Sequence, residues 1–476
     1  MVTDAVTLYW VCGAYLALVL GVSLWGYRRS ATEEEFLVAG RSIGPWVGGA
    51  VLAATQISAG TFVGTLGRYY QTGQSWGWAW FGVWAGWVVS AVFVAPRLRK
   101  FGALTVADYV GTRFASEHAR TIAAVLIVVC YSILLTAQFQ AIGEIGAAVF
   151  GVSPRTAMAL LLASTGFYTV IGGVRSSSYI EFIQTLVMIL ALVFAVPVVL
   201  SHTGGVEALG EFVGSIDPRI TGWYFTWKEI LATALAFGLG IAAAPYEMTR
   251  YYSMRDVATV RYAIGVSMLL QLFIAGAVMI LGIGMRGIYP YLPSADQASS
   301  IMASTIMSPL LGSLFVVAML SAIMSTVNSI LLVTGGAFAH DLYKRLVHRE
   351  ASQARLLTVN RISIVVLGII PFWIAGMKLG DVQAIVVEQA KFIASFFFVP
   401  VVFGLNWKRG TKAGAIWSMV AGFLGCLVWT FTGQRTVAVH GIDSVEVGVV
   451  LSAVAFVVAS RLTPPTPEKN LAVFFD

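Results

Sequence analysis

The sequence predicts an all-α, polytopic membrane protein. Hydrophobic residues make up 58% of the 476 residues and charged residues only 11%, whereas a soluble domain carries about 25% charged residues. Apolar runs of about 20 residues, the length that a helix needs to cross a bilayer, recur along the whole chain. The alternating pattern of a membrane β-barrel is missing. Helices are therefore the expected membrane-spanning elements.

About 13 transmembrane helices are expected, and together they form a single transmembrane domain over 1–476. Span one, 8–27, follows Asp4 and precedes Arg28 and Arg29. A cleavable signal peptide would have its basic residues first, so this span is expected to be retained. The span centres lie near Ala17, Ala54, Trp87, Ile133, Leu162, Leu190, Ala236, Leu272, Val317, Val366, Phe397, Ala421 and Ala453.

Basic residues are distributed unevenly among the loops between these spans. With the N-terminus placed outside, the predicted cytoplasmic loops hold 21 Lys and Arg residues, Arg250 among them, and the external loops hold 7. Cytoplasmic loops of membrane proteins carry the excess of positive charge. We therefore expect a multi-pass protein of the cell (inner) membrane with its N-terminus outside and its C-terminus cytoplasmic. The net charge of +7 belongs to this topology, so no nucleic-acid partner is expected.

Two spans have sequences that are unusual for helices facing lipid. Span two contains the polar residues Gln56, Ser58 and Thr61, and span seven contains small residues between Phe237 and Pro245. In inverted-repeat transporters, interrupted helices of this kind meet near the middle of the membrane and form the solute and ion sites. Close helix packing also accounts for small residues. The polar trio favours an interrupted helix.

Span nine concentrates oxygen-bearing side chains on one part of a helix, namely Ser325, Thr326, Asn328 and Ser329. Sodium binds neutral oxygens, which an intact helix supplies as hydroxyls and an interrupted helix as free carbonyls. An interrupted span two would supply the carbonyls of Ala54 and Ile57. Hydroxyls that bond back to their own helix are the alternative.

Three stretches of the chain form a joint signature. They are Phe36 to Pro45 (FLVAGRSIGP) continuing to Ala59, Tyr168 to Val174 (YTVIGGV) with Gln184 beyond it, and Ala322 to Asn328 (AIMSTVN) followed by Asp341 to Lys344 (DLYK). With these stretches the sequence resembles the sodium/solute symporter family, which includes bacterial proline, pantothenate and galactose symporters and animal sodium/glucose cotransporters. The likeness extends over nearly the whole chain.

This resemblance implies a LeuT-type fold of two inverted five-helix repeats. The first repeat is expected over about 44–200 and the second over about 228–405, followed by two C-terminal spans over about 413–460. It also implies sodium as the coupling ion. The implied sodium ligands are the carbonyls of Ala54, Ile57 and Ala322 with the hydroxyls of Ser325 and Thr326.

The sequence departs from the family at two carboxylates. Many members have Asp where this chain has Glu181, a position associated with sodium release or with a second sodium ion. A second sodium or release site formed by Glu181, Asn328 and Ser329, beside Ser325, is therefore one interpretation. An interfacial Glu181 solvated near Arg175 is the other. Glu144 stands where proline and pantothenate symporters have Arg, which argues against copying either solute.

The solute site is expected between spans two, four and seven. Gln56, Ser58, Thr61, Gln138, Phe237 and Gly238 are the candidate solute-binding residues, and a purely structural role is the alternative for Phe237. Other polar residues inside the spans have simpler explanations. We expect Glu388 and Lys391 to form an ion pair at i, i+3, and Gln271 to form a hydrogen bond between helices.

The predicted function is sodium-coupled secondary active symport, with import of a small organic acid or amino acid by alternating access. No catalytic residues are expected. The partners are the solute, sodium and the lipid bilayer, and the chain is expected to work as a monomer. A membrane-embedded solute sensor and a sodium-independent or proton-coupled carrier are the alternatives. A passive channel would need polar rings from symmetric subunits, and this chain carries an internal pseudo-repeat instead.

Overall fold

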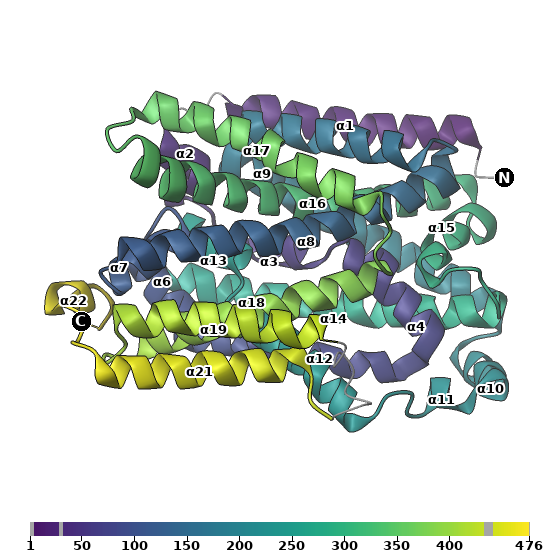
Figure 1. Cartoon of the computed structure of the whole chain (residues 1–476). Helices are drawn as coiled ribbons and strands as arrows, with labels where there is room; N and C mark the ends of the chain where they lie inside the picture. The colour runs from purple at the N-terminus through teal and green to yellow at the C-terminus, as the bar shows by residue number, and fades with distance from the viewer. Residues whose placement is uncertain (1–3, 28–31, 433–440, 476) are drawn as a thin grey trace.

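A computed structural model describes residues 4–27, 32–432 and 441–475. Most helices run side by side, with α1 and α17 on one side of the bundle and α19 and α21 on the opposite side (Figure 1). The described residues contain no β-strand, and one isolated bridge joins Ile43 to Met254. The predicted all-α class is confirmed. Arg28 and Arg29 lie outside the described residues.

The first half of the chain contains α1 (Ala5–Tyr27), α2 (Glu33–Val38), η1 (Ala39–Arg41), α3 (Pro45–Gln56), η2 (Gly60–Thr65), α4 (Leu66–Thr72), η3 (Gly73–Trp78), α5 (Ala79–Val89), η4 (Ser90–Val94), α6 (Ala95–Phe101), α7 (Val106–Arg113), α8 (Glu117–Phe150), α9 (Pro154–Thr203), α10 (Val206–Ile216) and α11 (Pro218–Thr221).

The second half contains α12 (Trp227–Ala242), α13 (Pro245–Ser253), α14 (Val257–Ile288), η5 (Ala295–Gln297), α15 (Ala298–Ile301), η6 (Met302–Ile306), α16 (Pro309–Gly336), η7 (Ala337–Val347), α17 (Gln353–Ala375), α18 (Val382–Asn406), α19 (Lys412–Phe431), α21 (Ser444–Leu462) and α22 (Glu468–Phe475).

Eleven helical segments of the described chain are long and apolar enough to cross a membrane. The two longest are Gly60–Phe101 with 42 residues and Pro154–Thr203 with 50. The second, α9, contains two of the expected span centres and breaks at Gly173, whose φ of 58° and ψ of −164° are not helical. A Cβ at this position would lie 2.8 Å from the Phe36 carbonyl, so the break requires glycine. The count of 13 stays a prediction.

Span two is interrupted in the middle of the bundle, as its sequence predicts. The helix α3 ends at Gln56, and Ile57 has an extended backbone with φ of −77° and ψ of 116°. The chain resumes a helical course in η2, a π-helical turn that begins at Gly60. The residues between the two pieces are buried, so this irregular backbone is shielded from lipid.

Span seven is interrupted as well. The helix α12 ends at Ala242, and α13 restarts at Pro245, where a missing N–H and a fixed φ suit the first helical turn. Ala244 between them is extended, with φ of −66° and ψ of 116°. The Tyr246 N–H at the new helix start donates to the Tyr131 hydroxyl of α8 at 3.0 Å.

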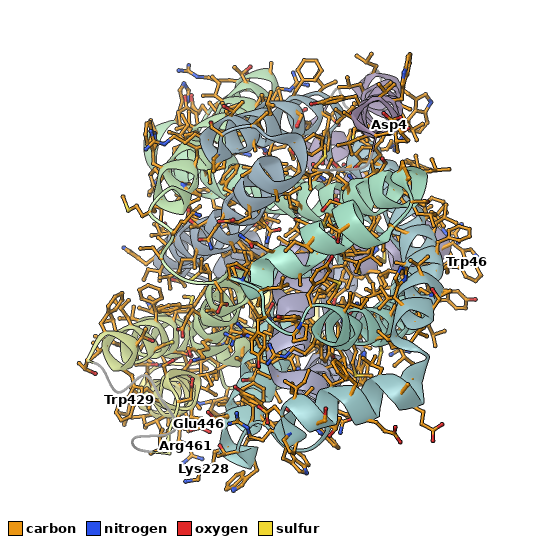
Figure 2. The ribbon with its side chains drawn as sticks, turned by 90° about the vertical axis from the view of Figure 1, so that its right-hand side faces the viewer. Asp4, Trp46, Lys228, Trp429, Glu446 and Arg461 are labelled. Carbon is orange, nitrogen blue, oxygen red and sulfur yellow. The ribbon has the colours of Figure 1, made fainter. Side chains whose placement is uncertain are left out.

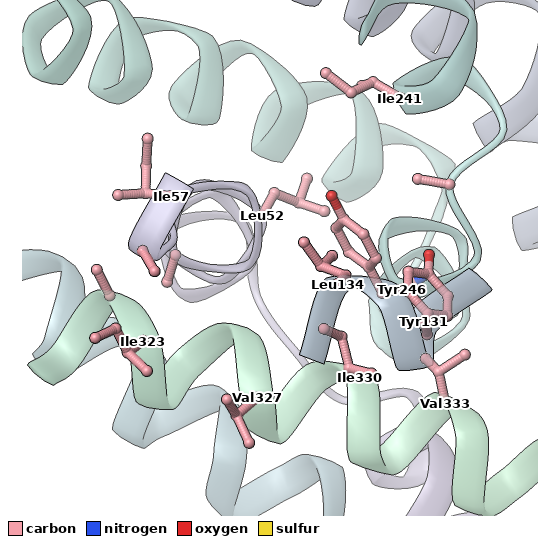
Figure 3. Close-up of a cluster of buried hydrophobic side chains, with 14 of the residues drawn as sticks. Leu52, Ile57, Tyr131, Leu134, Ile241, Tyr246, Ile323, Val327, Ile330 and Val333 are labelled. Carbon is pink, nitrogen blue, oxygen red and sulfur yellow. The ribbon is translucent and has the colours of Figure 1, made fainter. Parts of the chain in front are cut away.

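The core lies between the two interruptions and α16. Ile323, Val327 and Ile330 of α16 belong to the same buried hydrophobic cluster as Ile57 and Tyr131 (Figure 3). The outer surface of the bundle is apolar as well, because large apolar side chains are exposed there, where lipid would cover them. Trp46, which is 62% exposed, projects from the outer surface (Figure 2).

The two ends of the described chain lie at opposite ends of the bundle (Figure 1). This placement requires an odd number of crossings, as the predicted topology does. The basic helix α6, with Arg97, Arg99 and Lys100, lies at the same end as the C-terminal α22 (Figure 1).

Candidate functional site

The five residues predicted to bind sodium come together where span two is interrupted. The Ser325 hydroxyl lies 2.9 Å from the Ala54 carbonyl and 3.0 Å from the Ala322 carbonyl. The Thr326 hydroxyl lies 3.1 Å from the Ala322 carbonyl and 3.4 Å from the Ile57 carbonyl. Both side chains are at most 1% exposed. We call these five residues the neutral oxygen cluster.

The chemistry of this cluster suits a small, hard cation. Its oxygens come from two hydroxyls and three backbone carbonyls, none of which carries a formal charge. Each hydroxyl also lies close to the carbonyl of its own helix at Ala322, so back-bonding within α16 and contact with span two occur together. A cation at this point would replace hydrogen bonds that the hydroxyl protons make now. The carbonyls of span two are available because the helix stops there.

The residues predicted for a second sodium also meet, but an arginine joins them. The Arg250 guanidinium lies 2.6 Å from the Glu181 carboxylate and 2.6 Å from the Ser329 hydroxyl. Asn328 donates its side-chain N–H to Glu181 at 2.8 Å, and Ser329 donates its hydroxyl to Glu181 at 3.1 Å. We call these four residues the charged cluster.

Two expectations about this region are wrong. Glu181 is not an interfacial residue solvated near Arg175, because it is completely buried and Arg175 pairs with Glu35 at 3.0 Å instead. Arg250 does not lie in a solvated cytoplasmic loop, because it is 2% exposed within α13. The sequence contained a signal for this: Glu247 and Arg250 stand at i, i+3 directly after the Pro245 that restarts the helix.

A small cavity adjoins the neutral oxygen cluster and contains several of the predicted solute residues. Its volume is about 40 Å³, and Gln56, Ser58, Phe237 and Thr326 are among the residues that line it. Gln56 accepts a hydrogen bond from the Tyr246 hydroxyl at 3.0 Å across the cavity wall. Thr326 therefore belongs to both the cavity and the candidate sodium ligands.

A second cavity of about 40 Å³ shares Gln56, Ser58 and Phe237 with the first, and Thr61 lines it too. It shares Trp76 with a larger cavity of about 340 Å³, which Glu388 also lines. The three cavities thus form a series that leads from the neutral oxygen cluster toward one end of the bundle. On the other side of the charged cluster, the neighbouring cavity measures only about 20 Å³.

Two predicted solute residues are absent from the lining of the two small cavities. Gln138 accepts a hydrogen bond from the Ala59 N–H at 3.0 Å and so holds the interruption of span two. Gly238 packs against span three, where a Cβ would lie 2.7 Å from the Gly82 carbonyl. A hydrogen bond to the backbone accounts for the position of Gln138, and close helix packing accounts for Gly238; solute contact by either residue stays a prediction.

Other polar residues that the sequence analysis places in the spans have partners in the structure. Glu388 and Lys391 form the predicted pair at 3.3 Å, and Asp443 joins Lys391 at 2.9 Å. Gln271 accepts the predicted interhelical hydrogen bond from the Trp87 indole at 3.2 Å. Glu144 pairs with Lys378 at 2.6 Å.

A further cavity, of about 360 Å³, lies near the start of α18 and is lined by Arg68, Asp296 and Asp381 among others. The carboxylates of Asp296 and Asp381 have different hydrogen-bond and ion-pair partners. Asp381 pairs with Arg68 at 3.2 Å, whereas Asp296 accepts only a backbone N–H, from Val382 at 3.1 Å. Asp296 lies outside the membrane-spanning segments, and burial raises its pKa to about 6.

The sodium:solute symporter family matches residues 36–422 of this chain. The osmoregulated proline transporter OpuE of Bacillus subtilis (strain 168) is 25% identical over 475 residues, which cover 97% of this chain and 96% of OpuE.

Solved structures agree with this assignment at the level of the fold. A Na⁺-coupled sialic acid symporter in a substrate-bound, outward-open state superposes with a TM-score of 0.83 and 18% identity, over 97% of this chain and 99% of that one. Mhp1, a nucleobase-cation-symport-1 family transporter, superposes with a TM-score of 0.60 and 13% identity, over 92% of this chain and 97% of that one.

The chain belongs to the sodium:solute symporter family. It is a multi-pass membrane protein with a LeuT-type fold, and it is a transporter rather than an enzyme. Its activity is the sodium-coupled symport of a small solute.

Proposed function

We propose that the driving sodium ion binds in the neutral oxygen cluster and that the solute binds in the cavity beside it. The observation that carries this proposal is the position of Thr326, whose hydroxyl lies 3.4 Å from the Ile57 carbonyl and whose side chain lines the cavity. A sodium ion at Ser325 and Thr326 would fix the extended backbone of span two. The same backbone carries Gln56 and Ser58, so the ion would order the solute ligands.

We also propose a small organic acid or amino acid as the solute. The residues that line the first cavity include amides and hydroxyls but no charged side chain. Sodium and the positive N-terminal end of α13, which begins beside the cavity at Pro245, would then balance a carboxylate. OpuE is named a proline transporter, so L-proline is the first compound to test, although Glu144 marks a departure from that branch.

The cavity must widen before it can hold such a solute. Its volume of about 40 Å³ accommodates only a few water molecules, since one water needs about 10–15 Å³ measured in this way. We propose that the repeats over about 44–200 and 228–405 rock against each other and open the site alternately to either side. The series of cavities that begins at Trp76 would be the external route.

We also propose the orientation and location of the chain. The N-terminus is external, the C-terminus is cytoplasmic, and the membrane is the cell (inner) membrane. One lipid-embedded chain is sufficient for transport.

Purified protein in a thermal-shift screen tests the solute and the ion together. We expect L-proline or another small carboxylate to raise the midpoint in sodium and to have little effect in potassium. Uptake of the same compound into proteoliposomes should then require an inward sodium gradient. Stabilisation and uptake that are equal in the two salts would contradict sodium binding and favour a sodium-independent carrier. Stabilisation without uptake would favour a sensor.

A further inference from the structure

The charged cluster places a cation from the protein itself where a second sodium ion would bind. Arg250 is 2% exposed and Glu181 is completely buried. The guanidinium bridges the Glu181 carboxylate and the Ser329 hydroxyl, both at 2.6 Å. An arginine side chain keeps its charge at all physiological pH values. The cluster therefore already holds one positive charge.

The oxygens of the second candidate site are almost all occupied. Glu181 Oε1 accepts hydrogen bonds from Arg250, Asn328 and Ser329. Asn328 Oδ1 accepts from the hydroxyls of Thr169 and Ser177, at 2.8 and 2.9 Å. Within the described part of the chain, Glu181 Oε2 is the one oxygen of this set without a hydrogen-bond partner. A single free oxygen does not make a site for a hard cation, which needs several ligands.

The balance of buried charges explains why the Arg250 guanidinium is stable in the charged cluster. Glu247, three residues before Arg250 on α13, is also completely buried, and neither of its carboxylate oxygens accepts a hydrogen bond from a described residue. Without the guanidinium, Glu181 would lose the ion pair that it forms in the structure, and Glu247 would remain as a second buried carboxylate. The longer side chain of Glu181, compared with Asp, also brings its carboxylate one methylene closer to Arg250.

We propose that Arg250 is a tethered cation that occupies the second sodium position, so that this chain carries one sodium ion per transport cycle. The inference rests on the proposed function, because it takes the neutral oxygen cluster as the site of that one ion. Removal of the guanidinium while Glu181 is retained would leave a negatively charged set of oxygens. Such a set would bind a second sodium ion.

Binding of ²²Na⁺ to the purified, full-length protein tests the inference without any solute. A scintillation proximity assay, calibrated with the protein concentration, should give one sodium ion per wild-type chain. Arg250→Gln should give two, and Arg250→Lys, which keeps a cation, should give one. The double variant Arg250→Gln/Glu181→Gln, which removes both charges, should also give one. Ser325→Ala, in the otherwise unchanged chain, should weaken the binding of that one ion by about tenfold or more.

The outcomes separate the inference from the function on which it rests. Two sodium ions on the wild-type chain would overturn the inference while leaving the neutral oxygen cluster intact. One ion on both the wild-type chain and a folded Arg250→Gln variant would also overturn it. If Arg250→Gln does not fold, the wild-type count and Arg250→Lys still decide: one ion on each supports the inference, and two on either contradicts it. No binding to the wild-type chain would overturn the proposed sodium site itself.

Discussion

Two oxygen clusters lie one helical turn apart on α16, and they have opposite electrostatic designs. Ser325 and Thr326 belong to the neutral oxygen cluster, and Asn328 and Ser329 belong to the charged cluster. Thr55 lies between the two clusters, because its carbonyl is 3.4 Å from the Thr326 hydroxyl and its own hydroxyl is 3.3 Å from the Ser329 hydroxyl. The first cluster contains no charged side chain, and its hydroxyls donate to its own carbonyls. The second has a carboxylate, and the protein supplies its cation.

The difference shows that oxygen atoms at suitable positions do not by themselves make an ion site. What matters is how many of their lone pairs remain free. In the neutral oxygen cluster the hydroxyls can turn their protons away and the carbonyls of span two can then accept an ion. In the charged cluster, Arg250 and Asn328 already donate to Glu181. Four substitutions test this contrast.

Arg250→Gln should give the largest loss of stability. Removing one partner of a buried ion pair costs about 3–5 kcal/mol, because the other charge is left uncompensated. Thermal unfolding in detergent measures the loss, and it should be greater in potassium than in sodium. The matched control is Arg250→Gln/Glu181→Gln, which should recover most of the stability. Equal losses in the single and double variants would show that Arg250 packs without serving the Glu181 charge.

Ser325→Ala should weaken sodium binding by about tenfold or more. The variant removes one direct ligand oxygen, and about 1.4 kcal/mol corresponds to a factor of ten in affinity. Sodium-dependent thermal stabilisation gives the apparent affinity, and Thr326→Val should behave in the same way. Ser321→Ala, the same change at a buried serine one turn earlier on α16, is the control. If Ser321→Ala lowers the sodium affinity as much as Ser325→Ala does, the sodium ligand cannot be assigned to the turn that contains Ser325.

Gln56→Ala should raise the apparent KM for the solute about fivefold and leave the sodium affinity nearly unchanged. The side chain lines the cavity but does not belong to the neutral oxygen cluster, and a hydrogen bond contributes about 1 kcal/mol. Uptake rates measured against solute and against sodium separate the two effects. Gln271→Ala removes a buried glutamine bonded to Trp87 instead. Its KM should stay at the wild-type value.

Asp296 shows how burial changes the pKa of a carboxylate that forms no ion pair in the structure. Its pKa is raised to about 6 in the folded protein, above the unfolded value of about 3.9. Its neutral form therefore stabilises the fold fully below about pH 4, and this contribution is lost as the pH rises through about 6. Asp296→Asn should flatten the corresponding few-degree fall of the unfolding midpoint. A midpoint that falls equally in both proteins would place the titrating group elsewhere.

The sequence was sufficient for the parts of the fold that depend on composition and local chemistry. The polar trio Gln56, Ser58 and Thr61 predicts the interruption of span two, and Pro245 marks the restart of span seven. The spacing of the hydroxyls on span nine and the family signature predict which residues meet at the neutral oxygen cluster. These predictions held because membrane-buried polar groups have few alternative partners.

Other features depended on tertiary contacts that spacing does not reveal. The sequence predicts that Arg250 lies in a loop after an apolar span. In the structure, the packing of α13 against α9 and α16 brings its guanidinium to the Glu181 carboxylate. The sequence predicts Gln138 as a solute ligand, and this stays a prediction; the hydrogen bond that its side-chain oxygen accepts from the Ala59 N–H could not be predicted from spacing. The small residue Gly238 serves a close helix contact, which a composition argument does not separate from a binding role.

The most direct test of the account is the coupling between sodium and solute through the neutral oxygen cluster. Isothermal titration of L-proline, or of the compound that the screen identifies, should be done in sodium and in potassium, for the wild-type chain and for Ser325→Ala. Binding should be about 5–150-fold tighter in sodium for the wild-type chain, which corresponds to about 1–3 kcal/mol of coupling. The advantage of sodium should disappear in the variant. Equal affinities in the two salts for the wild-type chain, or an unchanged advantage in Ser325→Ala, would contradict the proposed sodium site.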